Sequence, residues 1–224
     1  AEKTQEFGTI SGAQSIEHDG ESITMQKAGL YLKEQDETLR KQVFEKMASR
    51  RSADIAGLDA LFDTLIQKRT KLAKNAGFEN YRDYKFKEMG RFDYSKESCF
   101  EFHNSVEKHI VPLVKKIQKE RLAKMNKVIF RPWDTAVNAE GKAPLKPFET
   151  GKEMLDGTIA VFDKINPEFS AFLKTMEEMK HLDLESKPGK APGGYNYPLY
   201  ESGAPFIFMN AVGSQGDLST MIHE

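Results

Sequence analysis

Apolar side chains recur at helical spacing through most of this chain, and that spacing limits the fold more than any other feature. Leu39, Val43 and Met47 lie about one helical turn apart after Asp36, a good capping residue. Similar runs follow further along the chain, over residues 55–72, 95–117, 150–165 and 167–179. The pattern predicts a mainly α fold of roughly seven helices, with a few short strands near residues 195–210.

Local breaks in these runs predict where helices bend or stop. Pro112 falls inside the run 95–117, so that helix should kink near Lys108 or begin afresh there. Before the first long helix, residues 18–20 (HDG) form a turn signal between residues 9–10 and 22–23. A short hairpin is expected over this stretch.

Composition excludes several classes of protein. The 224 residues are 39% hydrophobic and 30% charged, with 33 basic against 34 acidic side chains. This balance gives no general attraction to nucleic acid or to an anionic membrane, and no run reaches the ~18 apolar residues of a membrane span. The single cysteine, Cys99, excludes an internal disulfide and a thiolate metal cluster. A cytoplasmic protein without a nucleic-acid or membrane partner is expected.

Residues 127–148 interrupt the helical pattern. Residues 131–134 (RPWD) precede Gly141, Pro144 and Pro147, which indicates an ordered connection. Trp133 is expected to anchor this loop by packing. The chain is therefore predicted to comprise a helical subdomain (1–126), a linker (127–148) and the first part of a catalytic domain (149–224).

The closing segment contains three signals in a fixed order. Residues 189–195 (GKAPGGY) form a glycine–proline turn. Residues 206–209 are a short apolar run bounded by Pro205 and Asn210, which predicts a strand near a sheet edge. Asp217 is then available to cap a helix that leads into His223 and Glu224.

The interpretation of His223-Glu224 depends on the residues that precede this pair. In the motif His-Glu-x-x-His, both histidines face a zinc ion from one side of a helix, and the glutamate is the general base. A His-Glu pair alone is weak, because His18-Asp19 is a similar pair in a turn. The order of turn, strand and capped helix, however, is typical of a zinc-peptidase site, where an edge strand binds extended substrate by β-addition.

These residues resemble a known family. Residues 189–195, 205–210 (PFIFMN) and 217–224 (DLSTMIHE) are similar to oligoendopeptidase F, one of the thimet-oligopeptidase-like zinc peptidases. Residues 131–134 and 144–148 match the linker before the catalytic region of that family. The resemblance implies a zinc endopeptidase that hydrolyses short peptides with a metal-activated water.

The resemblance also implies roles for individual residues. His223 would be the first ligand of Zn²⁺, and Glu224 would be the catalytic base. The implied substrate-binding residues are Gly193, Gly194, Tyr195, Phe206, Ile207, Phe208, Met209 and Asn210.

The sequence departs from the family pattern at its end. The second histidine and the third zinc ligand are missing, so the chain looks cut within the motif. A catalytic zinc needs three protein ligands, so the 224-residue chain alone is expected to be inactive and to bind no zinc at His223. The expected partner is the C-terminal remainder of the same protein. The alternative is a non-catalytic helical binding or scaffolding module without peptidase ancestry.

Overall fold

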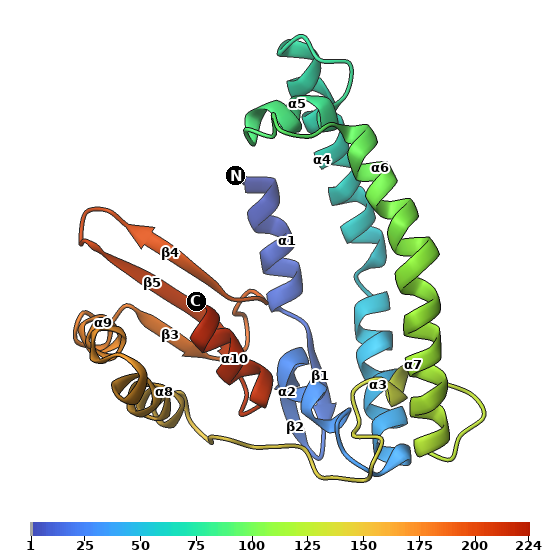
Figure 1. Cartoon of the computed structure of the whole chain (residues 1–224), viewed down its shortest axis with the longest axis vertical. Coiled ribbons are helices and arrows are strands. Elements are labelled where there is room, and N and C mark those ends of the chain that lie inside the picture. Colours follow the sequence, from blue (N-terminus) through green and yellow to red (C-terminus); the bar gives the residue numbers. More distant parts are fainter. Residues whose placement is uncertain (1) are drawn as a thin grey trace. The chain divides into compact units, whose positions relative to one another are not determined.

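The computed structural model describes residues 2–224, and the chain divides into two compact units. The larger unit combines the residues up to Asp54 with Arg131–Glu224, and the smaller one is Ile55–Phe130. The fold is mainly α with a small sheet near the C-terminus, as predicted (Figure 1). Among residues 2–224, no helix combines the length and apolar character needed to cross a bilayer. The predicted division into a helical subdomain, a linker at residues 127–148 and the first part of a catalytic domain stays a prediction.

The smaller unit is helical. Its α-helices are α4 (Ile55–Asn75), α5 (Tyr81–Glu88), α6 (Lys96–Ser105) and α7 (Val111–Lys124). The left-handed backbone of Gly77, with φ of +80°, follows α4, and the amide of Phe78 donates to the carbonyl of Ala73 at 2.9 Å. A glycine suits this position because it adopts positive φ without strain. Gly77 therefore ends the helix.

Helices α6 and α7 are separated by a π-helical turn, Val106–Ile110, and Pro112 lies in the first turn of α7. Proline has no amide hydrogen and obstructs the carbonyl four residues earlier, which belongs to Lys108. The predicted interruption near Lys108 is thus confirmed. The apolar face along this stretch is largely exposed, with Phe102 at 67% and Ile117 at 54%.

The N-terminal part of the larger unit surrounds a small apolar core. Its elements are α1 (Glu2–Gly12), β1 (Ser15–His18), β2 (Glu21–Thr24), α2 (Met25–Tyr31) and α3 (Glu37–Ser52). The hairpin is confirmed, but its first strand is Ser15–His18, while Thr9 and Ile10 lie in α1. Buried Ile16 and Ile23 pair across the two strands and pack with Val43 of α3.

The linker is anchored to α3, as predicted for Trp133. A short 3₁₀ helix, Pro132–Asp134, begins it, and the Trp133 ring lies 5.8 Å from that of Phe44. The guanidinium of Arg40 donates to the carbonyl of Trp133 and pairs with Asp134 at 3.0 Å. Both charged side chains are buried, so this contact ties residues 131–134 firmly to the helix.

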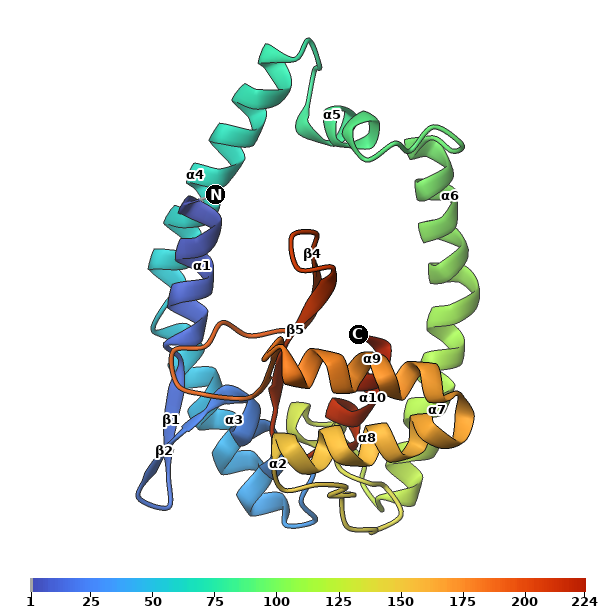
Figure 2. The ribbon, with the colours of Figure 1, turned by 90° about the vertical axis from the view of Figure 1, so that its left-hand side faces the viewer.

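The C-terminal part is a sheet covered on one face by helices. Its elements are α8 (Gly151–Ile165), α9 (Pro167–Glu178), β3 (Leu182–Glu185), β4 (Tyr195–Leu199), β5 (Ala204–Ala211) and α10 (Gln215–His223). Capping residues Thr150 and Asn166 start α8 and α9. Figure 2 shows the β4–β5 hairpin extending past these helices.

The strand order is β3–β5–β4, so the prediction that residues 206–209 form an edge strand is wrong. The strand itself is present, but β5 pairs in parallel with β3 and antiparallel with β4. Pro205 suggests an edge position, but a proline is also compatible with a central strand when it lies near the end of that strand. The edge beside the predicted site is β4.

Candidate functional site

The helix that carries His223 and Glu224 begins with a capping box. Ser214 is the N-cap, and its hydroxyl accepts from the amide of Asp217 at 3.2 Å. The Asp217 carboxylate accepts in return from the amides of Ser214 and Val212. Asp217 therefore has the N3 role rather than the predicted N-cap role, and the pattern Ser-x-x-Asp is the signal that identifies it. The side chain of Met221 is only 2% exposed, and it packs the helix against the core that includes β5.

The last turn of α10 lies beside β4. The side-chain amide of Asn196 in β4 donates to the carbonyl of Glu224. One turn earlier, Thr220 Cγ2 lies 3.5 Å from the position that a Cβ on Gly194 would occupy. Thr220, His223 and Glu224 share one helix face because residues three and four apart are neighbours. The structure thus brings the His223-Glu224 pair next to the turn and the strand at residues 194–196.

The glycine–proline turn is held from two sides. The Asn210 side-chain amide donates to the carbonyls of Ala191 and Gly193 at 2.9 and 2.8 Å. The end of α1 closes on the same turn, where the amide of Gly189 donates to the carbonyl of Gly12 at 3.1 Å. A Cβ on Gly12 would lie 3.0 Å from the carbonyl oxygen of Gly189, so a larger residue would crowd this approach and glycine suits it.

Lys190 reaches from the turn into a nearly enclosed polar position. Its ammonium donates to the carbonyls of Asp183 and Glu185 at 2.9 and 2.8 Å, and it pairs with the Asp183 carboxylate at 3.1 Å. It also lies 4.5 Å from the centroid of the Phe208 ring. Tyr195 stacks on that ring with a centroid separation of 4.9 Å. The ammonium therefore links the turn, β3 and the aromatic stack.

The charges at this position act on each other. Burial lowers the pKa of Lys190, and the hydrogen bond and charge of Asp183 oppose this effect. Partial burial favours the neutral form of Asp183, but hydrogen bonds from Lys187 and Lys190 hold the pKa of this carboxyl below its ordinary value. The lowered pKa favours the ionised form of Asp183, and three oxygen acceptors surround the Lys190 ammonium, which favours its charged form.

The predicted substrate-binding residues separate into two groups. Gly193, Gly194 and Tyr195 lie on the exposed β4 side, and Phe208 and Asn210 support them from β5. Phe206 faces the same side, opposite Tyr197. Ile207 and Met209 instead point into the core, each 2% exposed. A substrate cannot reach those two side chains.

A zinc ion does not fit the described residues by themselves. Catalytic zinc requires three protein ligands and an open position. Within residues 2–224, no cluster of three or more His, Cys, Asp or Glu side chains is arranged to hold a metal. His223 is a single imidazole at this end of α10, so these residues supply at most part of a ligand set.

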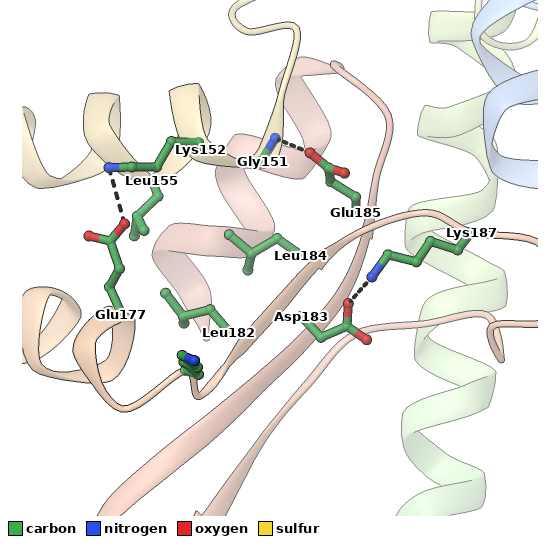
Figure 3. Close-up of a pocket in the computed structure, with 10 residues that line it drawn as sticks. Gly151, Lys152, Leu155, Glu177, Leu182, Asp183, Leu184, Glu185 and Lys187 are labelled. Carbon is green, nitrogen blue, oxygen red and sulfur yellow. Dashed lines mark hydrogen bonds and ion pairs between the residues drawn. The ribbon is translucent and has the colours of Figure 1, made fainter.

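A separate hollow of about 340 Å³ opens near the start of α8 (Figure 3). Four of its charged side chains form two ion pairs, Lys152 with Glu177 at 3.1 Å and Lys187 with Asp183 at 3.0 Å. The carboxylate of Glu185 accepts from the amide of Gly151 at 2.8 Å and so occupies the start of that helix. This hollow includes none of the residues predicted for the site.

Two contributors to the site were missed in the sequence. Asn196 lies in an unremarkable polar stretch, and nothing local indicates that its side chain reaches α10. Lys190 follows Gly189 in the glycine–proline turn and looks like an exposed turn residue, yet its side chain is 7% exposed. Both roles depend on contacts with residues distant in sequence.

Comparison with known proteins places this arrangement among peptidases. The sequence model of peptidase family M3 matches residues 30–224. A solved structure of PZ peptidase A with an inhibitor matches 100% of the chain at 28% identity and a TM-score of 0.92. A provisionally assigned oligoendopeptidase F from Bacillus anthracis strain Ames matches at 26% identity and the same TM-score. The chain spans 40% and 41% of the lengths of these two proteins. A comparison with curated proteins finds no match.

Proposed function

Because this chain belongs to peptidase family M3, we propose that it supplies part of a peptidase site that hydrolyses peptide bonds in short, extended peptides. One observation carries the proposal: the side chain of Asn196 ties the exposed edge strand β4 to the carbonyl of Glu224. An extended peptide on that edge would lie beside the helix turn that carries His223 and Glu224. Residues 149–224 are accordingly proposed as the first part of the catalytic domain.

The proposed roles of the two terminal residues follow their chemistry. The Glu224 carboxylate is the proposed base, which accepts a proton from the water that attacks the peptide bond. The His223 imidazole is the proposed first ligand of Zn²⁺. The remaining ligands would come from another part of the protein, because the described residues do not complete a set of three.

The substrate contact is proposed at β4 rather than at β5. The backbone of β5 pairs with strands on both sides, so Phe206 and Phe208 act by shaping the aromatic face and Asn210 by holding the turn. An edge strand presents unpaired backbone groups, which is the basis of peptide recognition by β-addition. Unstructured peptides are the substrate class that can pair in this way.

The wider setting is also part of the proposal. Family membership shows peptidase ancestry, so the alternative of a helical module unrelated to peptidases is wrong. We propose a cytoplasmic protein with short peptides as partners and no nucleic-acid or membrane partner. The C-terminal portion of the M3 fold is the proposed partner for catalysis, and the chain alone is proposed to be inactive.

Reconstitution tests this function. The chain would be mixed with the C-terminal portion of an M3 peptidase and assayed with an internally quenched octapeptide, with and without a chelator. Chelation should abolish cleavage, and Glu224→Gln should reduce it at least about 100-fold, as loss of a general base does. Glu201→Gln, in the exposed turn after β4, is the matched control and should leave cleavage unchanged. An active mixture that tolerates Glu224→Gln would refute the proposed role, and cleavage by the chain alone would refute its proposed inactivity.

A further inference from the structure

Along β4, the backbone amide and carbonyl groups of successive residues point alternately toward the partner strand β5 and toward solvent. In an antiparallel pair, opposite residues either exchange two hydrogen bonds or point their amide and carbonyl groups away from each other. Pro198 lies opposite Pro205. Since neither proline has an amide hydrogen, this pair cannot be a hydrogen-bonded one. By alternation, Asn196 and Ile207 form the next pair whose backbone groups point apart.

Two hydrogen bonds on the far side of β5 agree with this assignment. The amide of Ile207 donates to the carbonyl of His181 at 2.9 Å. The carbonyl of Pro205 accepts from Nδ1 of His181 at 3.1 Å. Both β5 residues therefore direct their backbone groups toward β3. Their partners on β4, Asn196 and Pro198, consequently direct theirs to the free edge.

The free edge of β4 is therefore short and asymmetric. Within Tyr195–Leu199 it presents one amide hydrogen, on Asn196, and two carbonyl oxygens, on Asn196 and Pro198. Proline supplies no hydrogen at the second position, and both residues are exposed. A left-handed Gly193 precedes the strand and a left-handed Gly203 lies in the turn that follows it, so the strand is not extended at either end.

We propose that this edge selects extended peptides in one register, set by Asn196 and Pro198: it binds two peptide amides that lie two residues apart and one peptide carbonyl. This inference rests on the proposed function. The two bound amides need a hydrogen, so proline and N-methylated residues are excluded at two positions only. The two-residue spacing holds for either direction of the peptide, because outward carbonyls on a strand recur every second residue.

The same register sets the surroundings of the peptide side chains. Side chains of paired residues lie on the same face of a sheet, so the peptide residue opposite Asn196 faces the helix side, where Asn196 contacts Glu224. Its two neighbours face the other side, next to Tyr195 and Tyr197, which are 49% and 60% exposed. These rings favour apolar or aromatic peptide residues at the two flanking positions.

An N-methyl scan tests the register. The parent probe is an octapeptide of alanine with a central phenylalanine, blocked at both ends and labelled for fluorescence anisotropy, and each variant carries one N-methyl group. Loss of a backbone hydrogen bond together with a steric clash should weaken binding to the chain about 10-fold or more at two amides, two residues apart. The other positions should stay within about twofold of the parent. A flat scan, or loss at adjacent amides, overturns the register.

Two proline substitutions provide a matched pair. Pro198→Ala adds an amide hydrogen to the free edge and should tighten binding of the parent probe about 3- to 10-fold. Pro205→Ala makes the same chemical change on the cross-strand partner, but its amide faces β3, so affinity should not change. Equal effects of the two substitutions contradict the assignment of the edge.

Amide hydrogen exchange separates this inference from the proposed function. In the free chain, the amide of Asn196 should exchange rapidly while those of Tyr195 and Tyr197 are protected, and the probe should then protect Asn196. If the parent probe protects no amide of β4, peptide binding at this edge is refuted, and the register with it. If it protects Asn196 but the N-methyl scan is flat, only the register is refuted.

Discussion

Replacing Asp134 by alanine is expected to destabilise the larger unit by about 3–5 kcal/mol. The carboxylate is fully buried and accepts from the Arg40 guanidinium at 3.0 Å. Arg40 has no route to water, since its side chain is 3% exposed. Its other donors already bind the carbonyls of Glu34, Gln35 and Trp133. The substitution therefore leaves a buried positive charge without its counter-ion, which costs far more than the pair itself contributes.

Urea denaturation followed by tryptophan fluorescence measures this loss. Trp133 is the only tryptophan in the chain, and its ring lies beside Phe44 in the affected contact. Glu45→Ala on the same helix is the matched control, because the Lys41–Glu45 pair is exposed and should contribute about 0.5 kcal/mol or less. The double change Arg40→Met with Asp134→Leu should recover much of the loss. A loss below about 1 kcal/mol for Asp134→Ala would show that the buried charge is relieved in some other way.

Three further predictions concern the sheet and α10. Met221→Ala should reduce the free energy of unfolding by about 2–5 kcal/mol, because it empties a buried position in the core cluster that includes Ile207; a loss below about 1 kcal/mol in urea denaturation would contradict this packing. Ser214→Ala should cost about 1 kcal/mol through loss of the helix cap, measured in the same way; an unchanged midpoint would contradict it. The pKa of Asp183 is lowered in the folded chain. The ionised carboxylate therefore stabilises the fold above the ordinary pKa of an aspartate, and this stabilisation is lost as the pH falls through the pKa of Asp183 in the folded chain. Asp183→Asn should flatten the acid limb of the stability–pH curve measured by thermal unfolding, and an unaltered acid limb would contradict the pairing with Lys190.

Local signals in the sequence were sufficient for the long helices and for the strand and capped helix at the C-terminus. Pro112 predicts the interruption near Lys108 because the obstruction acts within one helical turn. Gly77 likewise stops α4 through its own backbone conformation. The strand at residues 206–209 is also predictable from its apolar run, because strand propensity is read over a few neighbouring residues.

Features that depend on distant partners could not be predicted in this way. Whether β5 is an edge or a central strand depends on β3 and β4, and Pro205 is compatible with both positions. Thr9 and Ile10 read as a short strand, yet they belong to a helix whose end packs on the turn near Gly189. The buried pair of Arg40 and Asp134 joins residues 94 positions apart, and no periodicity reports such a contact.

A paramagnetic label on a bound peptide would show which part of the chain the peptide contacts. The octapeptide probe would carry a nitroxide at its central residue, and broadening of the amide signals of the chain would be measured by NMR. Broadening is expected at Asn196, Tyr197 and His223 together, with none at Ile16 in the hairpin core. Broadening centred on Leu182–Glu185, the opposite edge of the same sheet, would contradict a peptide site between β4 and the end of α10.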